Sequence, residues 1–179
     1  RHWRETSLSS TYELTMLHWE AQLQKDLGKS IMSLLQSLTT KAAEKALAYT
    51  VVGTLLAAVS LPMALIGLLD YIDSLWSIAV ERAEEAGKEL AKALLLRPHG
   101  HRPVTLVGYS MGCRVIFSCL KELARMDTRD LKSLIGDVVL LGAPLELRDK
   151  HWARVRTVVS GRLINGYSRK DLVLSVIYR

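Results

Sequence analysis

The sequence contains one short motif whose residue types suit nucleophilic chemistry, the GxSxG pattern Gly108-Tyr109-Ser110-Met111-Gly112. It lies between a β-rich run and a run with helical periodicity, and this strand-turn-helix context is typical of a nucleophile elbow. A sharp turn there lifts the serine hydroxyl toward a base, and we expect Gly108 and Gly112 to leave room for the close chain contacts of that turn. The Met111 N–H at the helix start is the predicted oxyanion donor. The alternative is a tight turn that uses small residues for packing alone.

The candidate acid is Asp171, which follows a predicted strand by a short loop. Its place after Ser110 matches the chain order serine, acid, histidine. Asp171 also suits the N-cap of a helix predicted over 172–179, and one carboxylate can serve both roles. Glu146 is the reserve acid, together with Asp149. Each lies among arginines and lysines, as a surface carboxylate would.

No histidine occupies the place in the chain where the base of such a triad is expected. The five histidines are His2, His18, His99, His101 and His151. Four of them precede the elbow, whereas His151 follows it but comes before Asp171. Triads are defined by geometry, so His151 stays a candidate base, although a surface or packing role beside Trp152 fits it better. We therefore expect the base to lie beyond Arg179, and we expect little or no hydrolysis by the 179-residue chain alone.

Three β-rich runs are predicted to form the sheet that positions these residues, at 104–107, 137–141 and 162–165, with a helix over 113–126. Near-continuous apolar strands joined by helices indicate a parallel sheet covered on both faces. Such a sheet places its ligands beyond the carboxyl ends of the strands, where Ser110, Glu146 and Asp171 project. Asp137 lies at the opposite end, as a solvated strand start.

The residues before the elbow are predicted to be mainly helical. Alternation over Tyr12–Glu20 predicts a short strand, and leucines at a period near 3.6 predict an amphipathic helix over Ala21–Leu38. Thr39-Thr40 and Asp73-Ser74 are predicted N-caps of the helices that follow. The second of these helices ends at Leu96, before a segment with two prolines and a glycine.

An uncharged apolar run extends from Ala46 to Leu69, which is long enough for a membrane span. Pro62 divides it into arms of about 15 and 8 residues, and neither arm crosses a hydrocarbon core of about 30 Å alone. Three alternatives stay open. The run forms a hairpin that dips into one leaflet, an internal lid, or a true membrane crossing.

Composition favours one globular domain, because 49% of the 179 residues are hydrophobic and 23% are charged. The net charge of +6 is concentrated in residues 97–179, where 15 Lys and Arg face 7 Asp and Glu. This half suits an anionic surface. Since no nucleic-acid motif is present, we expect a membrane surface as partner and no nucleic acid.

The remaining chemistry-bearing residues set further limits. Cys113 and Cys119 are six residues apart in one predicted helix, too far to form a disulfide, which indicates a reducing compartment. No cluster has the spacing of metal ligands, so neither a metal nor another cofactor is expected. The sequence does not specify an oligomeric state.

Several strings together resemble the family of transmembrane and coiled-coil domain-containing protein 4, a branch of the α/β-hydrolases. They are Arg102–Gly112, Val139–Pro144, Lys150–Trp152 and Val159–Tyr167. The string Gly-Arg-Leu-Ile-Asn-Gly-Tyr that ends at Tyr167 is far more specific than GxSxG. With the apolar run before the elbow, the resemblance covers most of the chain.

The resemblance implies a partial α/β-hydrolase fold, mainly a parallel sheet, in which residues 39–96 are a helical apolar insert or lid. It also implies a membrane-associated, lipase-like serine hydrolase at the cytosolic face, acting on a lipid or other ester. Ser110 matches the nucleophile of that family, and Asp171 resembles its triad acid.

The family's upstream strand and oxyanion loop, with a Gly-Trp motif, are absent here, as is the region after Asp171 that holds its histidine. We therefore expect residues 1–179 to be an incomplete domain, an excerpt or shortened isoform. The alternative function is a non-catalytic α/β-hydrolase-like scaffold that docks on a membrane or partner through its apolar hairpin.

Overall fold

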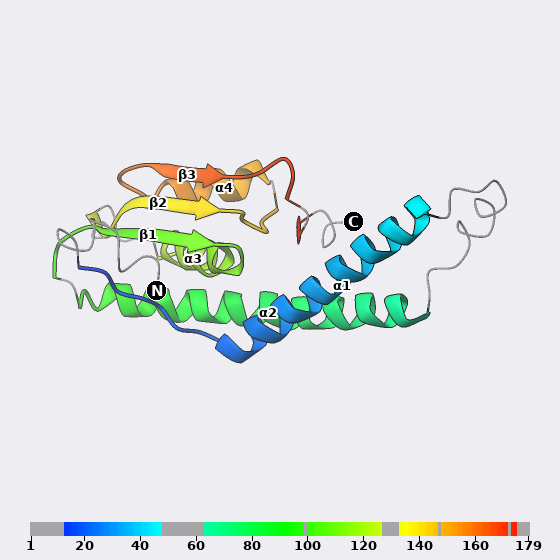
Figure 1. Ribbon diagram of the computed structural model, residues 1–179. Coiled ribbons are helices and arrows are strands. Elements are labelled where there is room, and N and C mark those ends of the chain that lie inside the picture. Colours follow the sequence, from blue (N-terminus) through cyan, green and yellow to red (C-terminus); the bar gives the residue numbers. More distant parts are fainter. Residues whose placement is uncertain are drawn as a thin grey trace.

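A computed structural model describes residues 13–47, 63–98, 100–126, 133–146, 148–171 and 173–174, without the side chains of 38–47 and 63–65. In this part of the chain a three-stranded parallel sheet and its helices form a partial α/β fold (Figure 1). The predicted fold class is confirmed.

The strands are β1 (Val104–Tyr109), β2 (Ile135–Leu141) and β3 (Leu163–Gly166), in the order β1-β2-β3. Both pairings are parallel, with Val107 opposite Val139 and Val139 opposite Ile164. The β-branched residues that predicted the strands thus lie side by side across the sheet. Because the strands run the same way, their carboxyl ends share one edge, as the sequence predicted.

Two helices connect the strands, α3 (Met111–Leu123) after β1 and α4 (Asp149–Arg156) after β2. They contact each other through the rings of Phe117 and Trp152, whose centroids are 5.0 Å apart. Both contribute to one core with the strands (Figure 1). Helix α3 was predicted from the sequence, whereas α4 was not.

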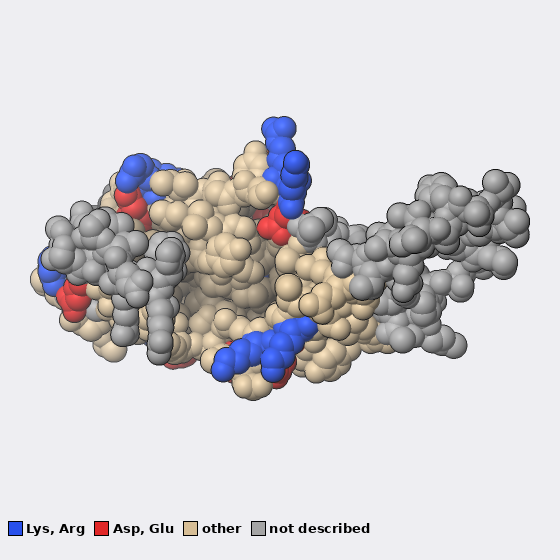
Figure 2. All heavy atoms as spheres, in the orientation of Figure 1, with Lys and Arg blue, Asp and Glu red and all other residues tan. Residues whose placement is uncertain are grey.

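The other face of the sheet carries exposed apolar side chains in the described structure. Val107, Tyr109 and Ile164 are 56%, 75% and 40% exposed. Figure 2 shows a largely uncharged surface on this side of the molecule, bordered by Lys and Arg. The expectation of a sheet covered on both faces is therefore wrong for the part of the chain that the structure describes, where α3 and α4 share a face.

A second layer of helices lies beyond α3. The long helix α2 (Met63–Leu95) packs on α3 through small buried residues, Ala79, Ala83, Gly87 and Ala91. Helix α1 (Ala21–Leu47) crosses α2 and buries Leu27, Ile31 and Leu34 against Ile72 (Figure 1). The predicted apolar face of α1 is thus the face that packs.

Three local predictions before the elbow are wrong. The described residues 13–20 form no strand. Glu13 pairs with Arg102, and Trp19 packs on an apolar cluster, called here the α1–α2 cluster, that consists of Leu27, Ile31, Leu34, Ile72, Ala79, Ala83, Met111 and Val115. Thr39-Thr40 lies inside α1, and Asp73-Ser74 lies inside α2. At Asp73-Ser74 the packing of the neighbouring Ile72 and Leu75 in the longer helix overrides the local capping signal.

Most of the uncharged run Ala46–Leu69 falls outside the described residues, and its last seven positions are the beginning of α2. Among the described residues, none of the helices combines the length and the apolar character that a bilayer crossing requires.

The two cysteines are buried in α3 with free thiols. Burial raises the pKa of Cys113 to about 11 and that of Cys119 to about 12. We expect neither thiol to react appreciably with an aromatic disulfide reagent at pH 8 in the native protein, because the thiolate is the reactive form. Both should react after denaturation, and rapid modification of one thiol in the native protein would contradict this expectation.

Candidate active site at the carboxyl edge of the sheet

Ser110 lies at the junction of β1 and α3 with a backbone conformation that is rare outside glycine. Its φ is 50° and its ψ is −122°. Two backbone hydrogen bonds hold this turn, as Ser110 N–H donates to the Leu141 carbonyl (2.9 Å) and Cys113 N–H donates to the Ser110 carbonyl (2.9 Å). Such a conformation costs about 1–3 kcal/mol and persists where surrounding structure enforces it, commonly at functional sites.

Close packing favours glycine at one of the two predicted elbow positions. A Cβ atom on Gly108 would lie 2.7 Å from Ile116 Cδ1 and 3.1 Å from the Cys113 nitrogen. Gly108 therefore lets the end of β1 touch the first turn of α3. Apart from its chain neighbours and the backbone of its own helix, no described atom lies within 4 Å of such a Cβ on Gly112. The space beside Gly112 is open there, and no packing contact explains its glycine.

Met111 is the first residue of α3, and its side chain is buried against the α1–α2 cluster. Its N–H group has no acceptor within the helix, because the residue four positions earlier belongs to β1. The positive end of the helix dipole lies at the same place. A backbone donor directly after Ser110 is thus available for a developing negative charge.

Asp171 lies above the carboxyl end of β2. Its Oδ2 atom is 3.7 Å from the position that a Cβ on Gly142 would occupy, and Tyr109 Cε2 is 4.0 Å from the same point. Its Oδ1 atom accepts a hydrogen bond from Leu174 N–H (3.0 Å), which is the capping contact that the sequence left open. Val173 packs on the cluster that contains Met111. The segment of Asp171 and the elbow helix therefore meet in one cluster.

The reserve carboxylates lie at the surface. Glu146 is exposed, with its Oε2 2.7 Å from Arg148 Nε, and Asp149 is the exposed first residue of α4. Both residues are therefore surface carboxylates, as their basic neighbours in the sequence indicate.

The described histidines lie in three different places. His151 is exposed on α4, and His18 is exposed before α1. His101 lies beside Arg97, before the start of β1 and thus at the opposite edge of the sheet. His2 and His99 fall outside the described residues. Among the described residues, no histidine is hydrogen-bonded to Asp171, and no group of three possible ligands is arranged to hold a metal ion.

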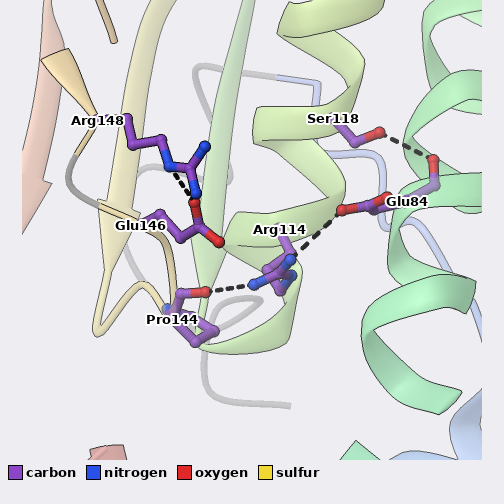
Figure 3. A network of polar contacts seen from close by, with 6 residues as sticks. All are labelled: Glu84, Arg114, Ser118, Pro144, Glu146 and Arg148. Atoms are coloured by element: carbon purple, nitrogen blue, oxygen red, sulfur yellow. Dashed lines mark hydrogen bonds and ion pairs between the residues drawn. The ribbon is translucent and has the colours of Figure 1, made fainter. Parts of the chain in front are cut away.

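Arg114 is the residue near this edge that sequence reasoning missed, because the helical pattern assigned it to the solvated side of α3. Its side chain is only 17% exposed. Nη1 donates to the Pro144 carbonyl (2.8 Å), and Nη2 lies 3.4 Å from Glu84 Oε1 (Figure 3). Nε is buried and has no acceptor among the described residues. One signal in the sequence is that Cys113 and Val115 flank Arg114. Apolar residues on both sides indicate that this part of the helix is buried on more than one face.

A model of the DUF726 family, described as a protein of unknown function, matches residues 1–179. The chain belongs to the DUF726 family. This DUF726 chain is 41% identical over 177 residues to an uncharacterized membrane protein of Caenorhabditis elegans, covering 99% of the chain and 28% of the relative. It is 42% identical over 168 residues to the transmembrane and coiled-coil domain-containing protein STS1 of Oryza sativa subsp. japonica. That match covers 93% of the chain and 25% of the relative.

A third relative carries a name that refers to an activity. The chain is 39% identical over 167 residues to the probable lipase MIL1 of Saccharomyces cerevisiae. The match covers 93% of the chain and 15% of the relative. The DUF726 chain thus spans between 15% and 28% of the length of these relatives. No solved structure matches it.

Proposed function

We propose that this chain is the core of a membrane-associated serine hydrolase with an α/β-hydrolase-like fold, acting on a lipid ester. The observation that carries the proposal is the positive φ of Ser110 between β1 and α3. A strained turn at this junction places a serine at the carboxyl end of a parallel sheet, as a nucleophile elbow does. The yeast relative named a probable lipase adds support from similarity.

Each residue at the carboxyl edge has a defined role in this proposal. Ser110 Oγ attacks the ester carbonyl while a histidine accepts its proton, and Met111 N–H donates to the oxyanion. The histidine then protonates the departing alcohol, and water hydrolyses the acyl-enzyme in the same way. Asp171 Oδ2 orients the histidine while Oδ1 keeps its capping bond to Leu174. The proposal assigns the histidine to the longer protein, outside residues 1–179.

Membrane association is part of the same proposal. Relatives in worm and rice are named as membrane or transmembrane proteins, and the basic half of this chain would attract anionic headgroups. We place the uncharged run Ala46–Leu69 at the bilayer, within a helical insert over 39–96, and the sheet on the cytosolic side, where buried free thiols stay reduced.

A fluorophosphonate probe tests the proposed nucleophile in the longer protein. We expect the probe to label one serine, and mass spectrometry of the labelled peptide to identify it as Ser110, because only an activated hydroxyl reacts rapidly. Labelling that occurs at other serines alone, or that persists equally after denaturation, would contradict the proposal.

A non-catalytic scaffold is the second candidate, and the capping bond of Asp171 favours it, since that bond gives the carboxylate a structural role. The elbow would then serve packing, and the apolar run would dock on a membrane or partner. In this case Ser110→Ala leaves the cellular role of the longer protein intact, whereas deletion of residues 46–69 abolishes it. The opposite pattern excludes the scaffold.

A further inference from the structure

We infer that Arg114 is a positioning residue for the proposed active site, because it ties the loop after β2 to the helix that follows Ser110. This inference rests on the proposed function. The guanidinium lies one helical turn beyond the nucleophile and contacts two other elements, the loop at Pro144 and helix α2 at Glu84 (Figure 3). Arginine can do this because its planar group presents several donors in fixed directions.

The loop that Arg114 holds borders the proposed site on the side of β2. Its first residue, Gly142, has a φ of 58° and donates its N–H to the Gly166 carbonyl (2.8 Å). The carboxylate of Asp171 and the ring of Tyr109 both lie against Gly142. A shift of this loop therefore moves the surroundings of Asp171 relative to Ser110.

The contact to Pro144 is the part of the network that bears on the loop. Pro144 is fully buried, so its carbonyl needs an internal donor, and Arg114 Nη1 supplies one at 2.8 Å. The contact to Glu84 is longer, and the Glu84 side chain is about half exposed. Helix α2 is also joined to α3 by the bond from Ser118 Oγ to the Glu84 carbonyl (2.9 Å). Loss of the Glu84 carboxylate therefore leaves the loop contact in place.

Three substitutions in the longer protein separate these roles. Arg114→Lys keeps the charge but loses the planar guanidinium that directs a donor at the Pro144 carbonyl. Glu84→Gln removes the ion pair and leaves the bond to Pro144. Ser118→Ala is the matched control, since it removes a bond between α2 and α3 without touching the loop. Arg114→Met is a stronger variant, and the conservative lysine variant decides the question if the methionine variant does not fold.

Two measurements are made on each variant, hydrogen exchange of peptides covering 142–146 and the second-order rate of fluorophosphonate labelling. We expect faster exchange in this loop and labelling about 10- to 100-fold slower for the Arg114 variants, because displacements near 1 Å can cost that much in rate. Glu84→Gln and Ser118→Ala should match the wild type in both measurements.

The outcomes distinguish this inference from the proposed function. Unchanged loop exchange in Arg114→Lys, or changed exchange with an unchanged labelling rate, overturns the positioning role. The positioning role is also overturned if Ser118→Ala lowers the labelling rate as much as Arg114→Lys does. Such a result would mean that any loosening of the contact between α2 and α3 slows labelling. If the wild-type protein does not label, the hydrolase proposal fails, and faster exchange in Arg114→Lys still supports the role of Arg114 in holding the loop.

Discussion

Replacing Ser110 by alanine in the longer protein lowers its ester turnover by about 10⁴- to 10⁶-fold, if Ser110 is the nucleophile of a triad. The loss is this large because the covalent route disappears, while binding and the Met111 N–H provide only residual acceleration. The measurement is hydrolysis of a short-chain aryl ester and of a phospholipid in mixed vesicles. The fold should persist, because Ser110 is a half-buried residue and alanine removes only its side-chain oxygen.

Ser118→Ala is the control for this experiment, as it removes a serine hydroxyl from the helix that follows Ser110, at a site away from the elbow. Its turnover should equal that of the wild type, and its stability should fall by about 1 kcal/mol for the lost hydrogen bond. A Ser110→Ala protein that retains more than about a tenth of the wild-type turnover contradicts the role of Ser110, since loss of a triad member costs orders of magnitude more.

The largest effect on stability is expected at Gly87, where α2 and α3 are in closest contact. A Cβ atom there would lie 2.5 Å from both Ser118 Cβ and the Val115 carbonyl oxygen, and 2.9 Å from the Cys119 nitrogen. Two of these three atoms belong to the backbone, so the helices must separate. We expect Gly87→Val to lower the free energy of unfolding by about 3 kcal/mol, which lowers Tm by about 6–12 °C in a domain of this size.

The matched control is Gly67→Ala, another glycine of the same helix. Apart from its chain neighbours and the backbone of α2 itself, no described atom lies within 4 Å of a Cβ there, and the residue is exposed. Alanine should raise the free energy of unfolding by about 0.5–1 kcal/mol, because it lowers the conformational entropy of the unfolded chain and has a higher helix propensity than glycine. Thermal unfolding followed by circular dichroism measures both variants. Equal stability of Gly87→Val and the wild type would show that α2 and α3 do not pack this closely.

The sheet and the elbow could be predicted because their signals are local. Each strand is a short run of apolar and β-branched residues, and glycine or proline marks the ends of these runs, so β1, β2 and β3 were found within a few residues of their bounds. The GxSxG pattern and its flanking elements also lie within one stretch of chain. Ser110, Gly108 and Met111 were therefore visible in the sequence as a unit.

The missed features depend on partners far away in the chain. Helix α4 has eight mostly polar residues with one buried side chain, Val155, so it shows no clear periodicity. The alternation near Leu14 looked like a strand, but a strand needs a neighbour that no local pattern reveals. Arg114 looked like a solvated helical residue, because both of its partners are 30 residues away in sequence.

Helix α2 is continuous over its 33 residues, which corresponds to a rod of about 50 Å. Its first turns contain the last residues of the uncharged run, and its later turns contact α3, directly behind Ser110. The two ends therefore belong to one unbroken helix, so a tilt of its apolar end carries over to the part that packs on α3. In the proposed hydrolase, the angle at which this helix meets the bilayer would set the direction in which the carboxyl edge of the sheet faces.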